Sequence, residues 1–276
     1  MSTSELHQRR HAGGYEPVDT RLGEQAHQII TADNHERDPS CWSQFSQWIQ
    51  NASYQVFAYT VWDSVVSGFK PGRIRAIELM DIQVKDRILL IGEGSGLDFE
   101  CLPTHTNKLA LRAFDFSPEM VHQSKLKARQ LDIPEENCFI GDAQDLPYTD
   151  EKFDKIYFPL SIASIPDPSL ALQEAERILA PQGKIIVFDK LRDEDTPLSW
   201  TRTALNIVTK CVFADITRNL GAILNPVPAL KIVHYESLKD KLDGIFARFA
   251  GQYYRVAVIT RRVDYPDKPE IPSKIQ

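Results

Sequence analysis

The chain has 276 residues, of which 42% are hydrophobic and 25% are charged, which is ordinary globular composition with room for one substantial core and an appendage. The formal net charge is −6 at pH 7 and no run of about five or six basic residues occurs, so no nucleic-acid partner is expected. The cysteines form no CxxC pair and no metal-ligand spacing, so we expect reduced, intracellular thiols and no metal: Cys41, Cys101, Cys138 and Cys211.

Residues 1–39 are polar and rich in His, Gln, Arg, Asp and Glu, which predicts a flexible N-terminal segment. They contain no apolar run of signal-peptide length, and the chain has no stretch of about 18 apolar residues. A soluble, cytoplasmic protein without a transmembrane segment is therefore expected.

Residues 40–80 are predicted to form a helical cap or lid, because Trp42, Phe45 and Ile49 recur at helical spacing in an aromatic stretch. Core packing is the favoured interpretation for each ring, and a lid that excludes water from the substrate is the alternative. Tyr59 is the candidate catalytic residue because of its place in this stretch. The apolar side chains are also compatible with peripheral membrane contact, although packing within the chain is favoured.

A buried strand, Ile88–Ile91, runs directly into a turn with glycine at every second position, Gly92, Gly94 and Gly96. Glycine tolerates positive φ and lets the backbone lie against a ligand, where a following helix offers unpaired N–H groups. The spacing completes neither the G-x-G-x-x-G dinucleotide fingerprint nor a P-loop. The turn therefore indicates a nucleoside site, with plain connection chemistry as the alternative.

Acidic side chains follow two further predicted strands. Asp115 ends the strand that begins at residue 109, about 20 residues after the glycine turn, where a carboxylate can accept hydrogen bonds from ribose hydroxyls. Asp142 follows a strand over residues 137–140 and is suited to accept from an adenine amino group, while the Ala143 N–H meets a ring nitrogen. For Asp142, a loop carboxylate without a role is an equally good interpretation.

The remaining elements continue the alternation of strands and helices. We predict strands over residues 153–158 and 184–188 with an amphipathic helix over 169–179 between them, and hence a parallel, doubly wound α/β sheet. A long helix over 198–220 precedes two late strands, which are expected to pair antiparallel at one sheet edge. The predicted cofactor domain spans residues 81–262, and 263–276 form a tail.

Segments in register over about residues 84–190 resemble class I S-adenosylmethionine-dependent methyltransferases of the ubiquinone/menaquinone-biosynthesis type. The resemblance implies a Rossmann-like, doubly wound seven-stranded sheet with an antiparallel last strand, S-adenosyl-L-methionine as cofactor and S-adenosyl-L-homocysteine as product. Residues 68–73 and 188–190 also resemble phosphatidylethanolamine N-methyltransferase-like members. The cofactor-binding positions expected from the residues and the resemblance together are Gly92, Glu93, Gly94, Ser95, Gly96, Asp115, Phe116, Met120, Asp142, Ala143 and Pro159.

Two departures from the family pattern bear on activity. The family usually carries an acidic residue where this chain has Leu90, and Glu93 inside the turn is the candidate substitute for contacting the methionine moiety. Many relatives carry a histidine in the loop after the fourth strand, where Ala163 and Ser164 stand here. A general base of that kind is therefore missing.

The resemblance implies a methyltransferase that acts on a small-molecule acceptor, such as a quinone-like compound, a lipid head group or a secondary metabolite. The sulfonium activates the methyl group, so in-line placement of the acceptor is the main task of the protein. The alternatives are a cofactor-binding module without transfer, or a relative that transfers another group. A nucleic-acid amino-methyltransferase is disfavoured because Phe158-Pro159-Leu160 is not the Asp/Asn-Pro-Pro-aromatic motif. The sequence does not indicate an oligomeric state.

Overall fold

A computed structural model describes residues 68–150, 152–192, 217–238 and 254–264. The chain divides into two units, Met1–Asp38 and Pro39–Gln276, and every described residue belongs to the second. Tyr59 and its aromatic stretch lie outside the described residues, as do the N-terminal segment, most of the predicted helix over 198–220 and the tail beyond residue 264.

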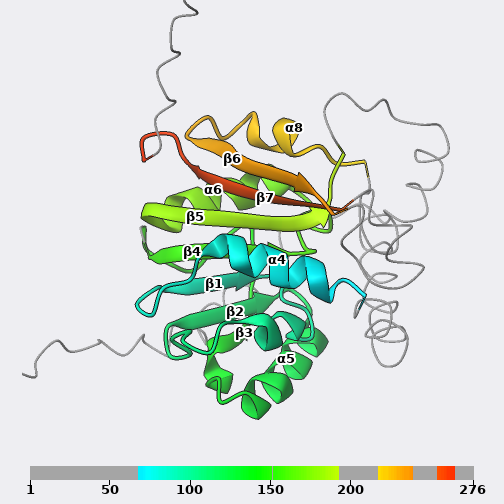
Figure 1. Cartoon of the computed structure of the whole chain (residues 1–276), viewed down its shortest axis with the longest axis vertical. Helices are drawn as coiled ribbons and strands as arrows, with labels where there is room; N and C mark the ends of the chain where they lie inside the picture. Colours follow the sequence, from blue (N-terminus) through cyan, green and yellow to red (C-terminus); the bar gives the residue numbers. More distant parts are fainter. Residues whose placement is uncertain (1–67, 151, 193–216, 239–253, 265–276) are drawn as a thin grey trace, which may run out of the picture. The chain divides into compact units, whose positions relative to one another are not determined.

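The described part is built on a seven-stranded sheet with the order β3-β2-β1-β4-β5-β7-β6 (Figure 1). The five strands from β3 to β5 are parallel, whereas β7 is antiparallel to both β5 and β6. This confirms the predicted doubly wound sheet with an antiparallel last strand. The strands are β1 Ile88–Ile91, β2 Leu111–Asp115, β3 Cys138–Ile140, β4 Phe153–Pro159, β5 Leu179–Lys190, β6 Leu230–Ser237 and β7 Tyr254–Arg261.

Helices cover both faces of this sheet, with α4 on the near face and α6 on the far face in Figure 1. Local sequence sets their starts: the Ser117 side chain accepts from Met120 N at 3.4 Å to cap α5, and Asp167 accepts from Ser169 N and Leu170 N at 3.0 Å to cap α6. The helices are α4 Lys70–Met80, η1 Leu97–Cys101, α5 Pro118–Gln130, η2 Glu135–Asn137, α6 Pro168–Ile178 and α8 Leu220–Leu224.

Two apolar clusters fill the space between helices and sheet. Leu89 and Ile91 belong to the cluster under α6 and α8, whereas Ile88 and Leu90 belong to the cluster under α4, η1 and α5. All four side chains are 0% exposed, because successive strand residues point to opposite faces and both faces are covered. Burial of each such side chain stabilises the fold by about 1.5–3 kcal/mol.

Strand β5 begins earlier than the sequence predicted. Its first residue, Leu179, pairs with Phe153, and a register shift separates that pair from the regular ladder that starts with Lys155 and Lys184. Gln182 has φ +60° within the irregular stretch. The Pro181–Gly183 signal therefore marks a bulge inside the strand instead of a turn before it.

Candidate functional site

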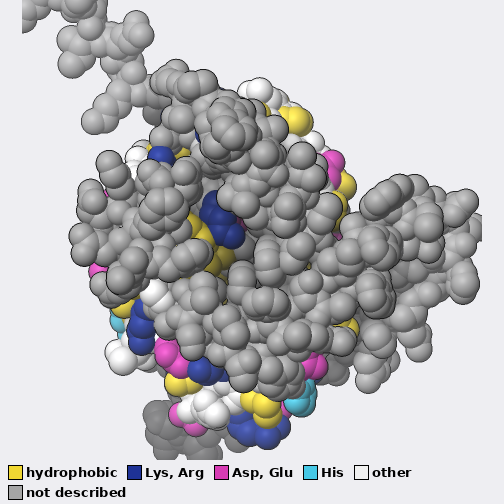
Figure 2. Space-filling view, turned by 90° about the vertical axis from the view of Figure 1, so that its right-hand side faces the viewer, with side chains coloured by type: hydrophobic (Ala, Val, Ile, Leu, Met, Phe, Trp, Pro, Cys, Tyr) yellow, Lys and Arg dark blue, Asp and Glu magenta, His cyan; other side chains and the backbone are white. Residues whose placement is uncertain are grey.

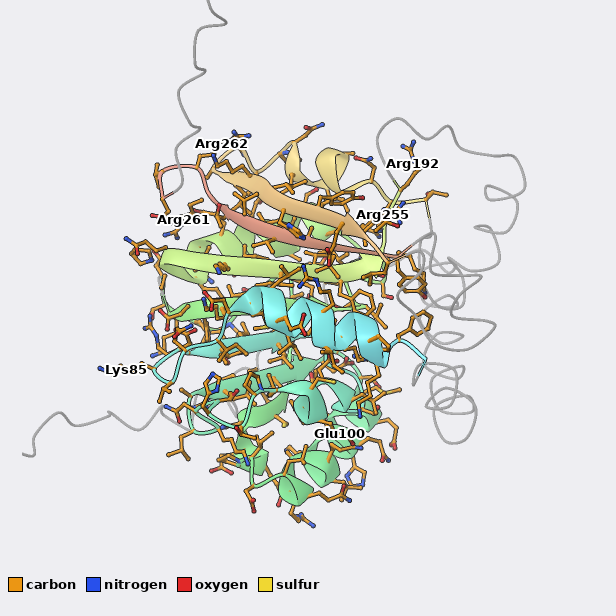
Figure 3. The ribbon with its side chains drawn as sticks, in the orientation of Figure 1. Lys85, Glu100, Arg192, Arg255, Arg261 and Arg262 are labelled. Atoms are coloured by element: carbon orange, nitrogen blue, oxygen red, sulfur yellow. The ribbon has the colours of Figure 1, made fainter. Side chains whose placement is uncertain are left out.

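The parallel strands place the predicted site residues at one edge of the sheet. Gly92 follows β1, Asp115 ends β2, Asp142 lies just beyond β3, and Pro159 ends β4. Figure 3 labels Lys85, just before β1, and Arg192, just after β5, at opposite edges, which identifies the right-hand edge as the carboxyl edge. Figure 2 looks onto this edge, where basic and hydrophobic side chains of the described part lie next to each other.

The glycine turn has the backbone conformation that its sequence predicted. Gly92, Gly94 and Gly96 have φ +70°, +61° and +80°. A Cβ on Gly92 would lie 2.5 Å from Cβ of Ser161, and one on Gly96 would lie 2.9 Å from the Phe99 ring. Among the residues that the structure describes, no atom would lie within 4 Å of a Cβ on Gly94. The first and third glycines therefore allow close packing, while the middle one faces open space that a ligand can use.

Replacing Gly92 by alanine is expected to destabilise the fold more than replacing Gly94. Both variants incur the cost of positive φ, about 1–2 kcal/mol. Only Gly92→Ala adds the collision with Ser161, which is worth about 1–3 kcal/mol. Free energies of unfolding from urea titrations would show the difference, and equal losses for the two variants would contradict this account.

The loop after β4 is fixed to the glycine turn by a residue that the sequence did not single out. Ser161 donates its hydroxyl to the carbonyl of Ile91 at 2.6 Å, directly under Gly92. Leu160, with φ +57°, donates its N–H to Phe188 O at 2.7 Å. The ends of β1, β4 and β5 are thus joined, and no titratable side chain had marked this link in the sequence.

Asp115 supports the turn from the neighbouring strand. Its Oδ2 accepts from Gly94 N at 3.0 Å, and its Oδ1 accepts from Ser117 N at 2.9 Å. Burial raises the pKa of Asp115, and these backbone N–H groups oppose that rise. A carboxylate oxygen has two lone pairs, so each can still accept from a hydroxyl. Phe116 beside it is 58% exposed, whereas Met120 is buried.

Asp142 is held by its own loop. Its Oδ1 accepts from Gln144 N at 2.9 Å and from Gln144 Nε2 at 3.0 Å, and Asp142 forms an isolated bridge with Asp145. Ala143 is buried beside it, and Pro159 is buried at the end of β4. The adenine contacts of Asp142 and Ala143 stay predictions.

Glu93 is the unexpected residue of the turn, because only 4% of it is exposed. Burial, and then the charge of Asp115, raise the pKa of Glu93 well above its ordinary value, while the Ser124 hydroxyl opposes the shift. Burial raises the pKa of the Cys138 thiol to about 12, and the charge of Glu93 contributes to that rise. Leu90, the other departure from the family pattern, is fully buried in apolar surroundings. The proposed contact of Glu93 with the cofactor stays a prediction.

The raised pKa of Glu93 predicts a pH-dependent stability. In the unfolded chain Glu93 loses its proton near its ordinary pKa of 4.5, whereas in the folded protein it keeps the proton to a higher pH. The unfolded state then binds fewer protons, so the free energy of unfolding falls by about 1.4 kcal/mol per pH unit above 4.5, up to the folded pKa. Glu93→Gln should flatten this slope above about pH 4.5, whereas Glu136→Gln on the surface should not. Unchanged slopes would contradict the assignment.

A buried ion pair holds the short helix that follows the turn. Arg73 of α4 donates to Asp98 of η1, and the hydroxyl of Tyr157 lies beside Asp98. Arg73, Asp98 and Tyr157 are 7%, 0% and 0% exposed. Burial raises the pKa of Asp98, and the Arg73 guanidinium opposes that rise. This pair fixes α4 and η1 under the glycine turn.

Comparisons with known sequences agree with this geometry. Residues 89–187 match a family model described as a methyltransferase domain. A phosphatidylethanolamine N-methyltransferase of Cereibacter sphaeroides is 27% identical over 43% of this chain and 58% of its own length. A ubiquinone/menaquinone biosynthesis C-methyltransferase of Rickettsia massiliae is 36% identical over 32% of this chain and 36% of its own length. The chain thus spans less than two thirds of these relatives.

Solved structures show the same fold at low identity. A geranyl diphosphate C-methyltransferase from Streptomyces coelicolor, in complex with Mg2+, geranyl diphosphate and S-adenosyl-L-homocysteine, has a TM-score of 0.54 and 15% identity over 68% of this chain and 78% of its own. The cyclase SpnF has a TM-score of 0.56 and 17% identity over 70% of this chain and 80% of its own. The fold alone therefore does not decide the chemistry.

The sheet order, the glycine turn and the strand-end carboxylates together define a Rossmann-like nucleoside-binding domain. Residues 89–187 match a methyltransferase domain, which confirms the predicted resemblance to class I S-adenosylmethionine-dependent methyltransferases and the cofactor of that class. Within the described ranges, none of the helices has the length and apolar character needed to cross a membrane.

Proposed function

We propose that this chain transfers a methyl group from S-adenosylmethionine to a small-molecule acceptor, leaving S-adenosylhomocysteine. The observation that carries the proposal is the open space at Gly94 directly beside the Asp115 carboxylate. Backbone can approach a ligand there, and the adjacent carboxylate can accept from paired hydroxyls, so the residues present fit a nucleoside. The relatives named for a quinone and for a lipid head group support acceptors of those kinds.

The described residues contribute binding and placement. Asp115 would hold the ribose, the backbone from Gly92 to Gly96 would line the methionine side, and Asp142 with Ala143 would contact the adenine. A bound sulfonium supplies an activated methyl group, so orientation of the acceptor can lower the barrier by up to about 7–11 kcal/mol. The loop from Leu160 to Pro166 is fixed to β1 and β5, and it would form the wall toward the acceptor.

Calorimetry of the full-length chain with S-adenosylmethionine and S-adenosylhomocysteine tests the binding half of the proposal. Detection of S-adenosylhomocysteine after incubation with a quinol or with phosphatidylethanolamine vesicles tests the transfer half. An absence of affinity for both nucleosides would overturn the assignment.

A binding module without methyl transfer is the second candidate. The structure gives it one specific support, because Leu90 is buried in an apolar core where the family usually has an acidic residue. Binding of S-adenosylmethionine with no product from any acceptor in a cell extract would favour this module. Donation of a group other than methyl would appear in the same assay as a product of different mass.

A further inference from the structure

Lys190 lies at the carboxyl edge, close to the loop that borders the proposed site. It is the last residue of β5, and its neighbour Asp189 accepts from Ala163 N at 2.8 Å. Ala163 belongs to the loop that Ser161 fixes to the end of β1 at 2.6 Å. The contacts thus lead from the glycine turn through this loop to the end of β5.

The surroundings of the Lys190 side chain are aromatic. Its Nζ lies 5.8 Å from the centre of the Tyr254 ring, a cation–π contact. The Tyr254 ring packs against Phe69 at 4.5 Å and against Phe188 at 5.9 Å between ring centres. Phe188 and Lys190 share a face of β5 because side chains alternate along a strand.

No carboxylate in the described part of the chain forms an ion pair with the Lys190 ammonium. Asp189 is fully buried, and its oxygens accept from backbone instead, Oδ2 from Ala163 N and Oδ1 from Lys190 N at 2.7 Å. Adjacent strand residues point to opposite faces, so Asp189 acts on the Lys190 ammonium only through its charge.

A partly buried ammonium that has no carboxylate partner among the described residues carries a desolvation cost there. Burial accordingly lowers the pKa of Lys190, and the charge of Asp189 opposes the shift. An anionic oxygen placed over the Tyr254 ring would offset this cost, and charge-assisted hydrogen bonds are among the stronger ones in proteins.

We propose that Lys190 selects the methyl acceptor by pairing its ammonium with an anionic oxygen of that molecule. The inference rests on the proposed function and specifies its substrate class: acceptors that carry a carboxylate or a phosphate group close to the methylated atom. The loop residues from Leu160 to Pro166 contain no titratable carboxyl, amine or imidazole group, so Lys190 supplies the charge from the neighbouring strand.

The test uses the full-length chain saturated with S-adenosylhomocysteine and labelled with 13C at lysine ε carbons. Lys190→Met and Lys184→Met identify the two signals, and Lys184, on the same strand near Asp81, is the control. The probes are two matched pairs, 4-hydroxybenzoate with 4-hydroxybenzamide and phosphoethanolamine with ethanolamine. We expect a probe with an anionic group to move the Lys190 signal, while its counterpart without that group leaves the Lys190 signal in place and the Lys184 signal responds to neither.

Affinity for that anionic probe should fall about 10- to 100-fold in Lys190→Met and be largely kept in Lys190→Arg, as expected for a lost charge-assisted hydrogen bond. A Lys190 signal that responds to neither anion, or an unchanged affinity in Lys190→Met, would overturn the inference. Calorimetry with S-adenosylhomocysteine is performed first, and an absence of binding would overturn both the proposed function and this inference. Normal binding combined with a Lys190 signal that does not respond to the anions would overturn only the inference about Lys190.

Discussion

Asp98→Ala is expected to lower the free energy of unfolding by about 3–5 kcal/mol, the usual loss when one partner of a buried ion pair is removed. The variant leaves the Arg73 guanidinium, which is 7% exposed, without its carboxylate. Because folded proteins are stable by only about 5–15 kcal/mol, much of the stability of the domain would be lost. Urea unfolding followed by far-UV circular dichroism measures the change.

Glu100→Ala is the matched control for this prediction. Glu100 lies on the same short helix as Asp98, and its side chain is 38% exposed where it pairs with Lys127 at 2.7 Å. Such a surface pair contributes about 0–1 kcal/mol. A double replacement, Arg73→Met with Asp98→Leu, should recover most of the loss because no buried charge remains. If Asp98→Ala cost no more than Glu100→Ala, the pair would not stabilise the domain.

The sequence predicted the centre of this domain well because the signals there are local. Four apolar residues in β1 indicated a strand covered on both faces, and the glycines after it indicated positive φ. The position of Asp115 at the end of β2 was predicted from the length of a strand-turn-helix-strand unit. Each of these predictions needs only a short stretch of chain, together with the rule that parallel strands end at one edge.

Other features depend on contacts between distant residues or on side-chain direction. Arg73 and Asp98 are separated by 25 positions, and Asp98 has the sequence context of an ordinary acid at the start of a helix. The contact of Lys190 with Tyr254 exists only because β7 pairs antiparallel with β5. The direction of Glu93 could not be predicted, because a turn with positive φ breaks the alternation that relates side chains to faces.

Asp115→Ala is expected to weaken the binding of S-adenosylhomocysteine about 100-fold or more. Two ribose hydroxyls that donate to a carboxylate contribute about 1.5–3 kcal/mol each, and every 1.4 kcal/mol is about a tenfold change in affinity. Titration calorimetry on the full-length chain measures this loss. Part of it has a second possible origin, because Asp115 also accepts from the backbone N–H groups of Gly94 and Ser117.

A ligand lacking the hydroxyls separates the two origins. Against the 2′,3′-dideoxy analogue of S-adenosylhomocysteine, Asp115→Ala should lose little affinity if the carboxylate acts on the ribose, because the groups that it would bind are absent. If the carboxylate acts only by shaping the turn through Gly94 N, the variant should lose equal affinity for both ligands. The coupling energy of this cycle isolates the pairwise term. A value near zero would show that Asp115 supports the turn without holding the sugar, and the nucleoside would then need another anchor at this edge.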